Sequence, residues 1–157
     1  MPRVEATRTV PVPLEIAFAV SQTHGPIRLE WDPFVRSQHL IDADEPAKGV
    51  RTRTVSRHRL KMTSEYVSYR PPTQVGMKMV EGPWFFSSFG GGWTFAAGAS
   101  DQETLATWRY TFRARPTWLA PIADRVGVWL LGRDIEKRLE AYAAACRNPS
   151  VLAAVHG

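Results

Sequence analysis

The last third of the chain has the pattern of a long helix. Residues 121–147 are expected to form it, because Pro121 suits a first helical turn and Asn148-Pro149 supplies a stop. At about 1.5 Å per residue, the helix would be about 40 Å long. Its second half carries one apolar stripe, with steps of three and four: Val128, Leu131, Ile135, Leu139, Tyr142 and Cys146.

The first half of this helix has apolar residues on a second face. Ile122, Val126, Trp129 and Leu130 point roughly opposite to the stripe. A helix that is apolar on several sides must be covered on several sides. The extra face therefore predicts a second contact, and we expect Trp129 to border a ligand cavity.

Before this helix, polar and apolar positions alternate in short segments that are typical of strands. Residues 3–10 form the first expected strand, and residues 14–21 and 27–31 then have helical spacing. The further expected strands are residues 34–41, 50–56, 60–69, 73–80, 84–97 and 103–115. Short turns between successive strands imply an antiparallel sheet with one buried face.

This order predicts an α+β fold in which a curved antiparallel sheet wraps around the long C-terminal helix. Two short helices follow the first strand. No repeat, low-complexity tract or linker divides the chain, so residues 1–157 are expected to form a single domain. Its core covers about residues 3–147, and the C-terminal tail, residues 148–157, is expected to fray toward its end.

An aromatic face on the strand at 103–115 is the strongest functional signal. Trp108, Tyr110 and Phe112 share it, and two hypotheses explain it: ordinary core packing, or the lining of a cavity for an apolar ligand. Ser64, Tyr66 and Ser88 are candidate polar groups in such a cavity. The candidate ligand-binding residues are Trp31, Phe34, Tyr66, Met77, Met79, Trp93, Trp108, Tyr110, Phe112, Ile122, Val126 and Trp129.

Composition narrows the class of protein. The 157 residues are 44% hydrophobic and 22% charged, as in ordinary globular proteins, and no apolar run is long enough to span a membrane. No signal peptide is recognisable, and the single Cys146 excludes an internal disulfide. We therefore expect a cytoplasmic protein, either a monomer or a homodimer.

The formal charge of +5 permits an anionic partner without requiring one. The basic run consists of Arg51, Arg53, Arg57, Arg59 and Lys61. We interpret it as a solvated outer face, so no nucleic acid partner is expected. Residues 90–92 are three glycines without the lysine of a phosphate loop, and they are interpreted as a bend in a strand.

Candidate acid–base chemistry is sparse. Glu30, Asp32 and His39 lie close together in the sequence, and a carboxylate beside an imidazole could move a proton. His39 and Tyr110 are the candidate catalytic residues. The alternative is that Asp32 is a cap and His39 a surface residue. The four histidines have no metal-ligand spacing, so neither a metal nor another cofactor is expected.

Several local sequences together resemble a known family. They are Val10-Pro11-Val12-Pro13 leading into Phe18, Trp31-Asp32-Pro33-Phe34, Tyr69-Arg70-Pro71-Pro72, Glu81-Gly82-Pro83 and Gly91-Gly92-Trp93-Thr94-Phe95, followed by the strand at 107–115 and the long helix. Over about residues 3 to 147, this order resembles the START-like (SRPBCC) superfamily, and most of all its polyketide cyclase/dehydrase-like branch. The resemblance implies a helix-grip fold with a deep cavity between the sheet and the last helix.

Three functions remain open at this point. The first is binding of a hydrophobic, aromatic or lipid-like small molecule in the cavity. The second is a polyketide cyclase/dehydrase-type enzyme that uses acid–base chemistry for aldol cyclisation and dehydration, with positioning supplying much of the acceleration. The third is a nucleic-acid or membrane-surface protein, which only the basic run favours.

Overall fold

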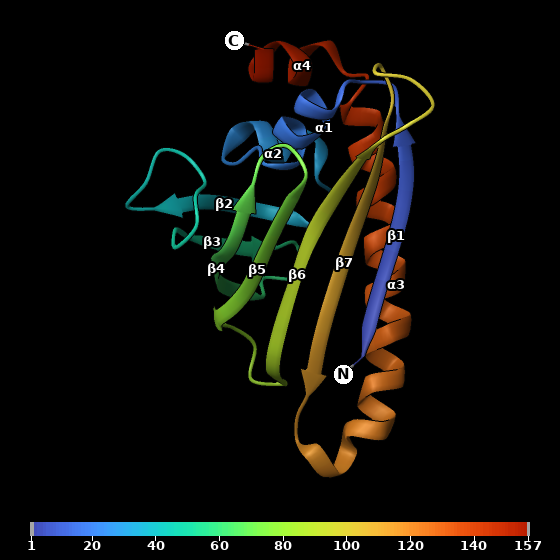
Figure 1. Ribbon diagram of the computed structural model, residues 1–157. Helices are drawn as coiled ribbons and strands as arrows, with labels where there is room; N and C mark the ends of the chain where they lie inside the picture. Colours follow the sequence, from blue (N-terminus) through green and yellow to red (C-terminus); the bar gives the residue numbers. More distant parts are fainter. Residues whose placement is uncertain (1, 157) are drawn as a thin grey trace.

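The computed structural model describes residues 2–156 (Figure 1). The elements follow the chain in the order β1 (Arg3–Val10), α1 (Leu14–Ser21), α2 (Pro26–Trp31), β2 (Val35–Ile41), β3 (Arg51–Ser56), β4 (Lys61–Arg70), β5 (Gln74–Glu81), β6 (Phe86–Ala97), β7 (Thr104–Ala114), the 3-10 turn η1 (Thr117–Leu119), α3 (Ala120–Ala145) and α4 (Pro149–His156). The expected α+β order of elements is confirmed.

All seven strands form one antiparallel sheet in the order β1-β7-β6-β5-β4-β3-β2. The first and last strands of the chain therefore pair with each other, with Val4 opposite Tyr110 and Val10 opposite Thr104. The sheet is strongly curved, and α3 lies along its β1 and β7 side (Figure 1). This is the predicted helix-grip arrangement. None of the helices within residues 2–156 is long and apolar enough to cross a membrane.

The C-terminal half of α3 joins the helix to the sheet. Ile135, Leu139, Tyr142 and Cys146 are almost completely buried, as their spacing predicts. The Tyr142 hydroxyl donates a 2.6 Å hydrogen bond to the carbonyl oxygen of Ala17, which also ties α3 to α1. This half of the helix is part of the core, whereas Val128, near its start, is 40% exposed.

The tail is a correction to the sequence analysis. Residues 149–156 form α4, which packs against α1, and Val151 is fully buried. Asn148 caps this helix because its side-chain oxygen accepts a hydrogen bond from the Ser150 amide, so Asn148-Pro149 ends α3 and also starts α4. An eight-residue helix is marginal alone and depends on this packing, which a local pattern does not reveal. Gly157 lies outside the described residues.

The glycine triplet, interpreted from the sequence as a bend, lies within β6 and contains no register shift. Gly90, Gly91 and Gly92 pair in register with both β5 and β7, and the register shift of β6 falls earlier, between Phe86 and Ser88. The glycines instead permit close approach of neighbouring backbones: a Cβ on Gly92 would lie 2.3 Å from the carbonyl oxygen of Val75. Gly91 lies opposite the inward-facing Tyr110, and its missing side chain also leaves room on the concave side of the sheet.

Candidate functional site

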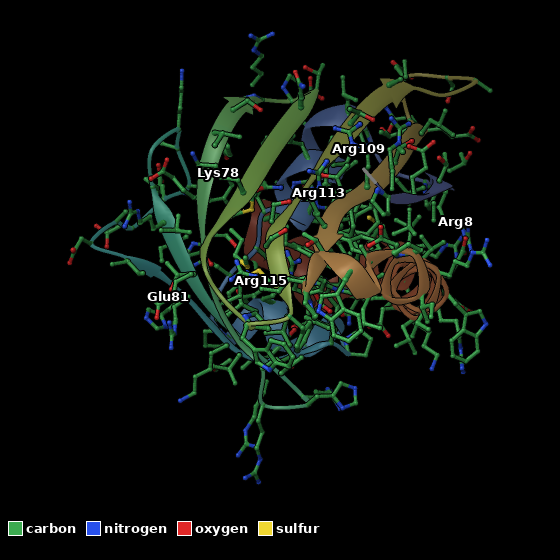
Figure 2. The ribbon with its side chains drawn as sticks, turned by 90° about the horizontal axis from the view of Figure 1, so that it is seen from below. Arg8, Lys78, Glu81, Arg109, Arg113 and Arg115 are labelled. Atoms are coloured by element: carbon green, nitrogen blue, oxygen red, sulfur yellow. The ribbon has the colours of Figure 1, made fainter. Side chains whose placement is uncertain are left out.

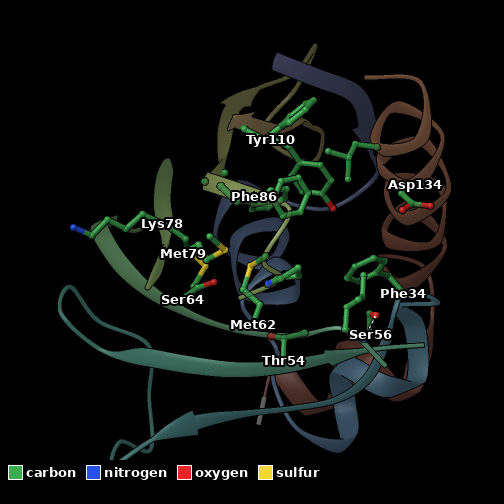
Figure 3. Close-up of a pocket in the computed structure, with 18 of the residues that line it drawn as sticks. Phe34, Thr54, Ser56, Met62, Ser64, Lys78, Met79, Phe86, Tyr110 and Asp134 are labelled. Carbon is green, nitrogen blue, oxygen red and sulfur yellow. Dashed lines mark hydrogen bonds between the residues drawn. The ribbon is translucent and has the colours of Figure 1, made fainter. Parts of the chain in front are cut away.

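A cavity of about 680 Å³ lies between the concave side of the sheet and the first half of α3 (Figure 3). Its volume is in the range of small-molecule sites, which is about 300–1,000 Å³. Most of the lining residues that are exposed to solvent belong to the turn between β3 and β4 and to η1 and α3, and they include Leu60, Ile122 and Val126; the exceptions are Lys78 on β5 and Arg115 after β7. The cavity therefore opens at this end of the molecule.

Two sides of the cavity differ in chemistry. Strands β6 and β7 supply an aromatic wall, with Phe86, Phe89, Tyr110 and Phe112, and three methionines adjoin it: Met62, Met77 and Met79. The inner face of β2, β3 and β4 is mainly polar, with these residues: Gln38, Thr52, Thr54, Ser56 and Ser64. On this polar wall, the side-chain oxygens of Gln38 and Thr52 are buried without a hydrogen-bond partner within residues 2–156. Such oxygens are available to a polar group of a ligand.

A buried ionic cluster forms the inner end of the cavity. Asp32 follows α2 and is completely buried, and its Oδ2 atom accepts hydrogen bonds from Arg28 Nε at 2.9 Å and Arg138 Nη2 at 2.7 Å. Its Oδ1 atom accepts from Arg138 Nε at 3.1 Å and from the amide of Phe34 at 3.1 Å. Arg28 and Arg138 line the cavity, but Asp32 does not, so the carboxylate lies behind the two guanidinium groups.

Aromatic rings hold both guanidinium groups in place. The Arg138 guanidinium carbon lies 4.2 Å from the ring centre of Trp108 and 4.5 Å from that of Phe34, and the Arg28 carbon lies 4.5 Å from that of Trp31. Guanidinium groups stack well on aromatic faces. The rings therefore leave mainly the edges of the guanidinium groups free for hydrogen bonds.

Burial and charge shift the proton affinities of this cluster. Burial alone raises the pKa of the Asp32 carboxyl, but the charges of Arg138 and Arg28 and the hydrogen bonds to Arg138 and Phe34 outweigh it and hold that pKa at about 2. Burial lowers the pKa of Arg28, while the attraction of Asp32 and Tyr110 outweighs burial and raises that of Arg138. At neutral pH the cluster contains two cations and one anion.

Two tyrosines bring hydroxyl groups to the same end. Arg138 Nη1 donates to the hydroxyl oxygen of Tyr110, and the Tyr66 hydroxyl donates to Gln22 Oε1 at 3.1 Å. Burial raises the pKa of Tyr110 and raises that of Tyr66 to about 12. Both hydroxyls are therefore protonated at neutral pH and can act as hydrogen-bond donors, not as bases.

Most of the predicted ligand-binding residues lie around the cavity. They are Phe34, Tyr66, Met77, Met79, Trp93, Trp108, Tyr110, Phe112, Ile122 and Val126. Ser64 also lines it, whereas Ser88 does not, because the register shift at the start of β6 changes which residues face inward. On the aromatic face, core packing and the cavity wall coincide: Phe112 is fully buried and also lines the cavity.

Trp129 corrects the expectation that it borders the cavity. Its side chain is 60% exposed, is not part of the lining, and stacks on the Arg133 guanidinium at 4.9 Å. Ile122 and Val126, from the same apolar face, do line the mouth of the cavity. The sheet curves away from this half of α3, so the helix leaves part of its apolar surface uncovered.

Trp31 and His39 also lie outside the cavity. Trp31 packs on the core side, with its ring centre 5.8 Å from that of Tyr142, and donates a hydrogen bond to Thr23. His39 is exposed on β2, where its neighbours Gln38 and Leu40 line the cavity, so alternation turns its side chain outward. Glu30 is exposed as well. The candidate acid–base pair of His39 with a nearby carboxylate is therefore not formed within residues 2–156, and the alternative of a surface histidine applies.

Arg28 and Arg138 are the site residues that the sequence analysis missed. Arg138 falls on the apolar stripe, three residues after Ile135, where it interrupts a buried pattern. A charge on a buried stripe indicates a paired or functional group. Arg28 precedes Asp32 by one helical turn, a spacing that brings an arginine and an aspartate together.

Two arginines of the basic run have partners on the outer face of the sheet, and the cysteine is buried. Arg51 on the outer face pairs with Glu65 at 3.1 Å, and Arg53 donates to Thr63 at 3.0 Å. Arg109 and Arg113, on β7, likewise point away from the cavity (Figure 2). Cys146 is buried, and burial raises the pKa of its thiol to about 11, so it is a poor nucleophile at neutral pH.

The sequence matches the family described as polyketide cyclase / dehydrase and lipid transport over residues 1–147. No curated protein matches it. The fold is similar to that of an aromatase/cyclase from Streptomyces sp. R1128, with 18% identity over 92% of this chain and 93% of that one and a TM-score of 0.74. A START superfamily protein from Mycobacterium smegmatis is 13% identical over 94% of this chain and 98% of that one, with a TM-score of 0.74. A protein from Thermus thermophilus is 20% identical over 98% of this chain and 99% of that one, with a TM-score of 0.75.

Proposed function

The chain belongs to the polyketide cyclase / dehydrase and lipid transport family, and from that premise we propose that it binds a hydrophobic small molecule, aromatic or lipid-like, between the sheet and α3. The cavity of about 680 Å³ is the observation that carries this proposal. Its lining combines a large apolar surface with a few placed polar groups, which is the usual composition of a small-molecule site.

The aromatic wall favours flat, ring-containing ligands. Phe89 lies 5.4 Å from Tyr110 and 5.0 Å from Phe86 between ring centres, so these rings form a continuous surface. Rings stack well on such surfaces, and the flexible methionines beside this wall adapt to ligands of irregular shape. The uncharged fluorescent amine N-phenyl-1-naphthylamine is a suitable first probe, because it is apolar and has two aromatic ring systems.

We expect N-phenyl-1-naphthylamine to bind and to raise the melting temperature. A ligand that binds only the folded state at about 100 times its Kd adds about 2.7 kcal/mol of stability. Thr54 faces the cavity (Figure 3), and Thr54→Trp should weaken binding at least about tenfold because the indole occupies the space of the ligand. Fluorescence titration measures the affinity.

The matched control is Thr94→Trp, which makes the same change at an exposed position of β6 outside the cavity. It should leave the affinity for the probe unchanged. If neither N-phenyl-1-naphthylamine nor flavonoids and fatty acids change the melting temperature, the cavity does not bind hydrophobic ligands and the proposal fails. Equal weakening by both variants would place the probe elsewhere.

The second candidate function is cyclase/dehydrase activity, and the contact between Tyr110 and Arg138 favours it. Arg138 polarises the Tyr110 hydroxyl, whose raised pKa keeps it protonated. The Tyr110 hydroxyl is thus suited to donate a hydrogen bond to a carbonyl oxygen of the substrate, where negative charge develops during aldol closure. The cavity would supply the folded conformation of a poly-β-ketone substrate.

Tyr110→Phe tests the enzymatic candidate with little change of shape. If the protein cyclises a poly-β-ketone mimic, this variant should lower kcat about 100-fold while binding of N-phenyl-1-naphthylamine persists. Tyr69→Phe, outside the cavity, is the control and should keep full activity. Binding without any turnover by the wild-type protein would instead favour a carrier.

A further inference from the structure

We propose that the inner end of the cavity binds an anionic oxygen group, so that the ligand is an apolar aromatic molecule carrying one acidic group such as a carboxylate. This inference rests on the proposed function, because it concerns the same cavity. Arg28 and Arg138 are the residues that would bind the acidic group, together with the Tyr110 hydroxyl.

The balance of charge leaves an uncompensated cation facing the cavity. Arg28 and Arg138 carry two positive charges and Asp32 one negative charge, so the cluster has a net charge of +1. Both arginines are more than nine-tenths buried. An unpaired charge in such surroundings is costly, and an anionic ligand would remove that cost.

The remaining charged residues of the lining do not reverse this balance. Lys78 and Arg115 are exposed at the rim and are positive, and His24 and His58 also line the cavity. Asp134 is the single acidic residue of the lining, one helical turn before Arg138 (Figure 3), and it forms no ion pair within residues 2–156. The positive charges outnumber it, which favours the entry of anions.

The hydrogen-bond donors at this end are in excess. Arg28 Nε donates to Asp32, and Nη1 donates to the carbonyl oxygens of Ser21 at 2.7 Å and Thr23 at 3.4 Å. Arg28 Nη2 and the hydroxyl proton of Tyr110 have no acceptor within residues 2–156, although both side chains are buried and line the cavity. An oxygen acceptor of the ligand would satisfy both donors.

The guanidinium groups of the cluster are also preorganised for an anion. Asp32 and the two aromatic rings fix the plane of Arg138, and Trp31 supports that of Arg28. Fixed donors lose little freedom on binding, which increases affinity. A cluster with a structural role alone would be indifferent to the charge of the ligand, and this difference can be measured.

Two fluorescent probes with the same ring systems test whether the cavity prefers an anionic ligand. 8-Anilino-1-naphthalenesulfonate is N-phenyl-1-naphthylamine with one added sulfonate, so the comparison isolates the charge. We expect the sulfonate to bind at least about tenfold more tightly at pH 7, because hydrogen bonds to charged groups are strong. Added salt should reduce this preference. Thr54→Trp should weaken the binding of both probes, which would locate their binding site in the cavity.

Arg28→Met identifies the residue responsible. It should weaken binding of the sulfonate at least about tenfold more than it weakens binding of the uncharged amine. The control Arg113→Met, on the outer face of β7, should change binding of neither probe by more than about twofold. Arg28→Lys should retain part of the preference. Asp134→Asn should strengthen binding of the sulfonate, because it removes a negative charge from the lining.

The outcomes separate this inference from the proposed function. If the uncharged amine binds in the cavity and the sulfonate binds no more tightly, the inference is overturned and the proposed function stands. If neither probe binds, both fail. The affinities of the two probes for the wild-type protein distinguish these outcomes even if Arg28→Met does not fold.

Discussion

Replacing Asp32 with asparagine is expected to lower the free energy of unfolding by about 3–5 kcal/mol, because it leaves buried cations without their counter-charge. Arg28 and Arg138, both nearly fully buried, would then face each other with a combined charge of +2. The amide also cannot accept from Arg28, Arg138 and the Phe34 amide together. Urea unfolding followed by circular dichroism measures the loss.

Glu30→Gln is the matched control for this substitution. It converts a carboxylate to an amide two residues earlier, but Glu30 is exposed and contacts only the Ser150 hydroxyl through a 3.2 Å hydrogen bond. The change in stability should stay within about 0.5 kcal/mol. A loss of less than about 1 kcal/mol for Asp32→Asn would contradict the central role of the cluster.

The Asp32 contribution should also disappear in acid. Its pKa is 3.8 in the unfolded chain and about 2 in the folded protein, so the unfolded state takes up the proton first as the pH falls. The contribution is fully present above about pH 4, amounts to about 2 kcal/mol, and is lost between about pH 4 and 2. The difference between wild type and Asp32→Asn should therefore shrink across this window, and a constant difference would refute this assignment.

Adding a single methyl group at Gly92 is expected to destabilise the protein by about 3 kcal/mol. In Gly92→Ala, the new Cβ would lie 2.3 Å from the carbonyl oxygen of Val75 and 3.3 Å from the Cα of Gly76. Both are backbone atoms of the adjacent strand, which cannot rotate out of the way as a side chain can. Strands β5 and β6 would have to separate where they form the cavity wall. The same urea titration measures the effect.

Gly132→Ala is the control. It makes the same substitution, but its expected effect on stability has the opposite sign. Gly132 lies inside α3, and a Cβ there would meet nothing within 4 Å. Alanine favours a helix over glycine by about 1 kcal/mol, so this variant should be more stable than the wild type. Equal effects at the two positions would show that the close approach at Gly92 does not limit the packing of the sheet.

The order of the elements was predictable because most segments have a clear local period. The alternation of Trp108, Tyr110 and Phe112 assigned one face of β7 correctly, and the spacing of Ile135, Leu139 and Tyr142 located the buried face of α3. Two features have no such local pattern: α4 depends on packing against α1, and the register shift of β6 at Phe86 depends on how β6 pairs with β7.

The apolar part of the site was also accessible from the sequence, since residues that share a strand face meet in space. The ionic cluster was not, because Arg138 is 106 residues away from Asp32 and no local rule joins them. From the sequence, His39 is a candidate catalytic residue and Trp129 is expected to border the cavity, but the structure places both outside it. Alternation on β2 turns His39 out, and the sheet does not extend far enough to cover Trp129.

The sequence by itself determined the elements, their order and the apolar faces that must be buried, because these follow from periodicity along single segments and from turn residues between them. Only the tertiary structure decided which buried residues border empty space and which pack solidly, since that depends on how far the sheet curves away from α3. It also decided the charge at the inner end of the cavity, because the fold brings Arg138 of α3 to Arg28 and Asp32, although Arg138 is 106 residues from Asp32 in the chain.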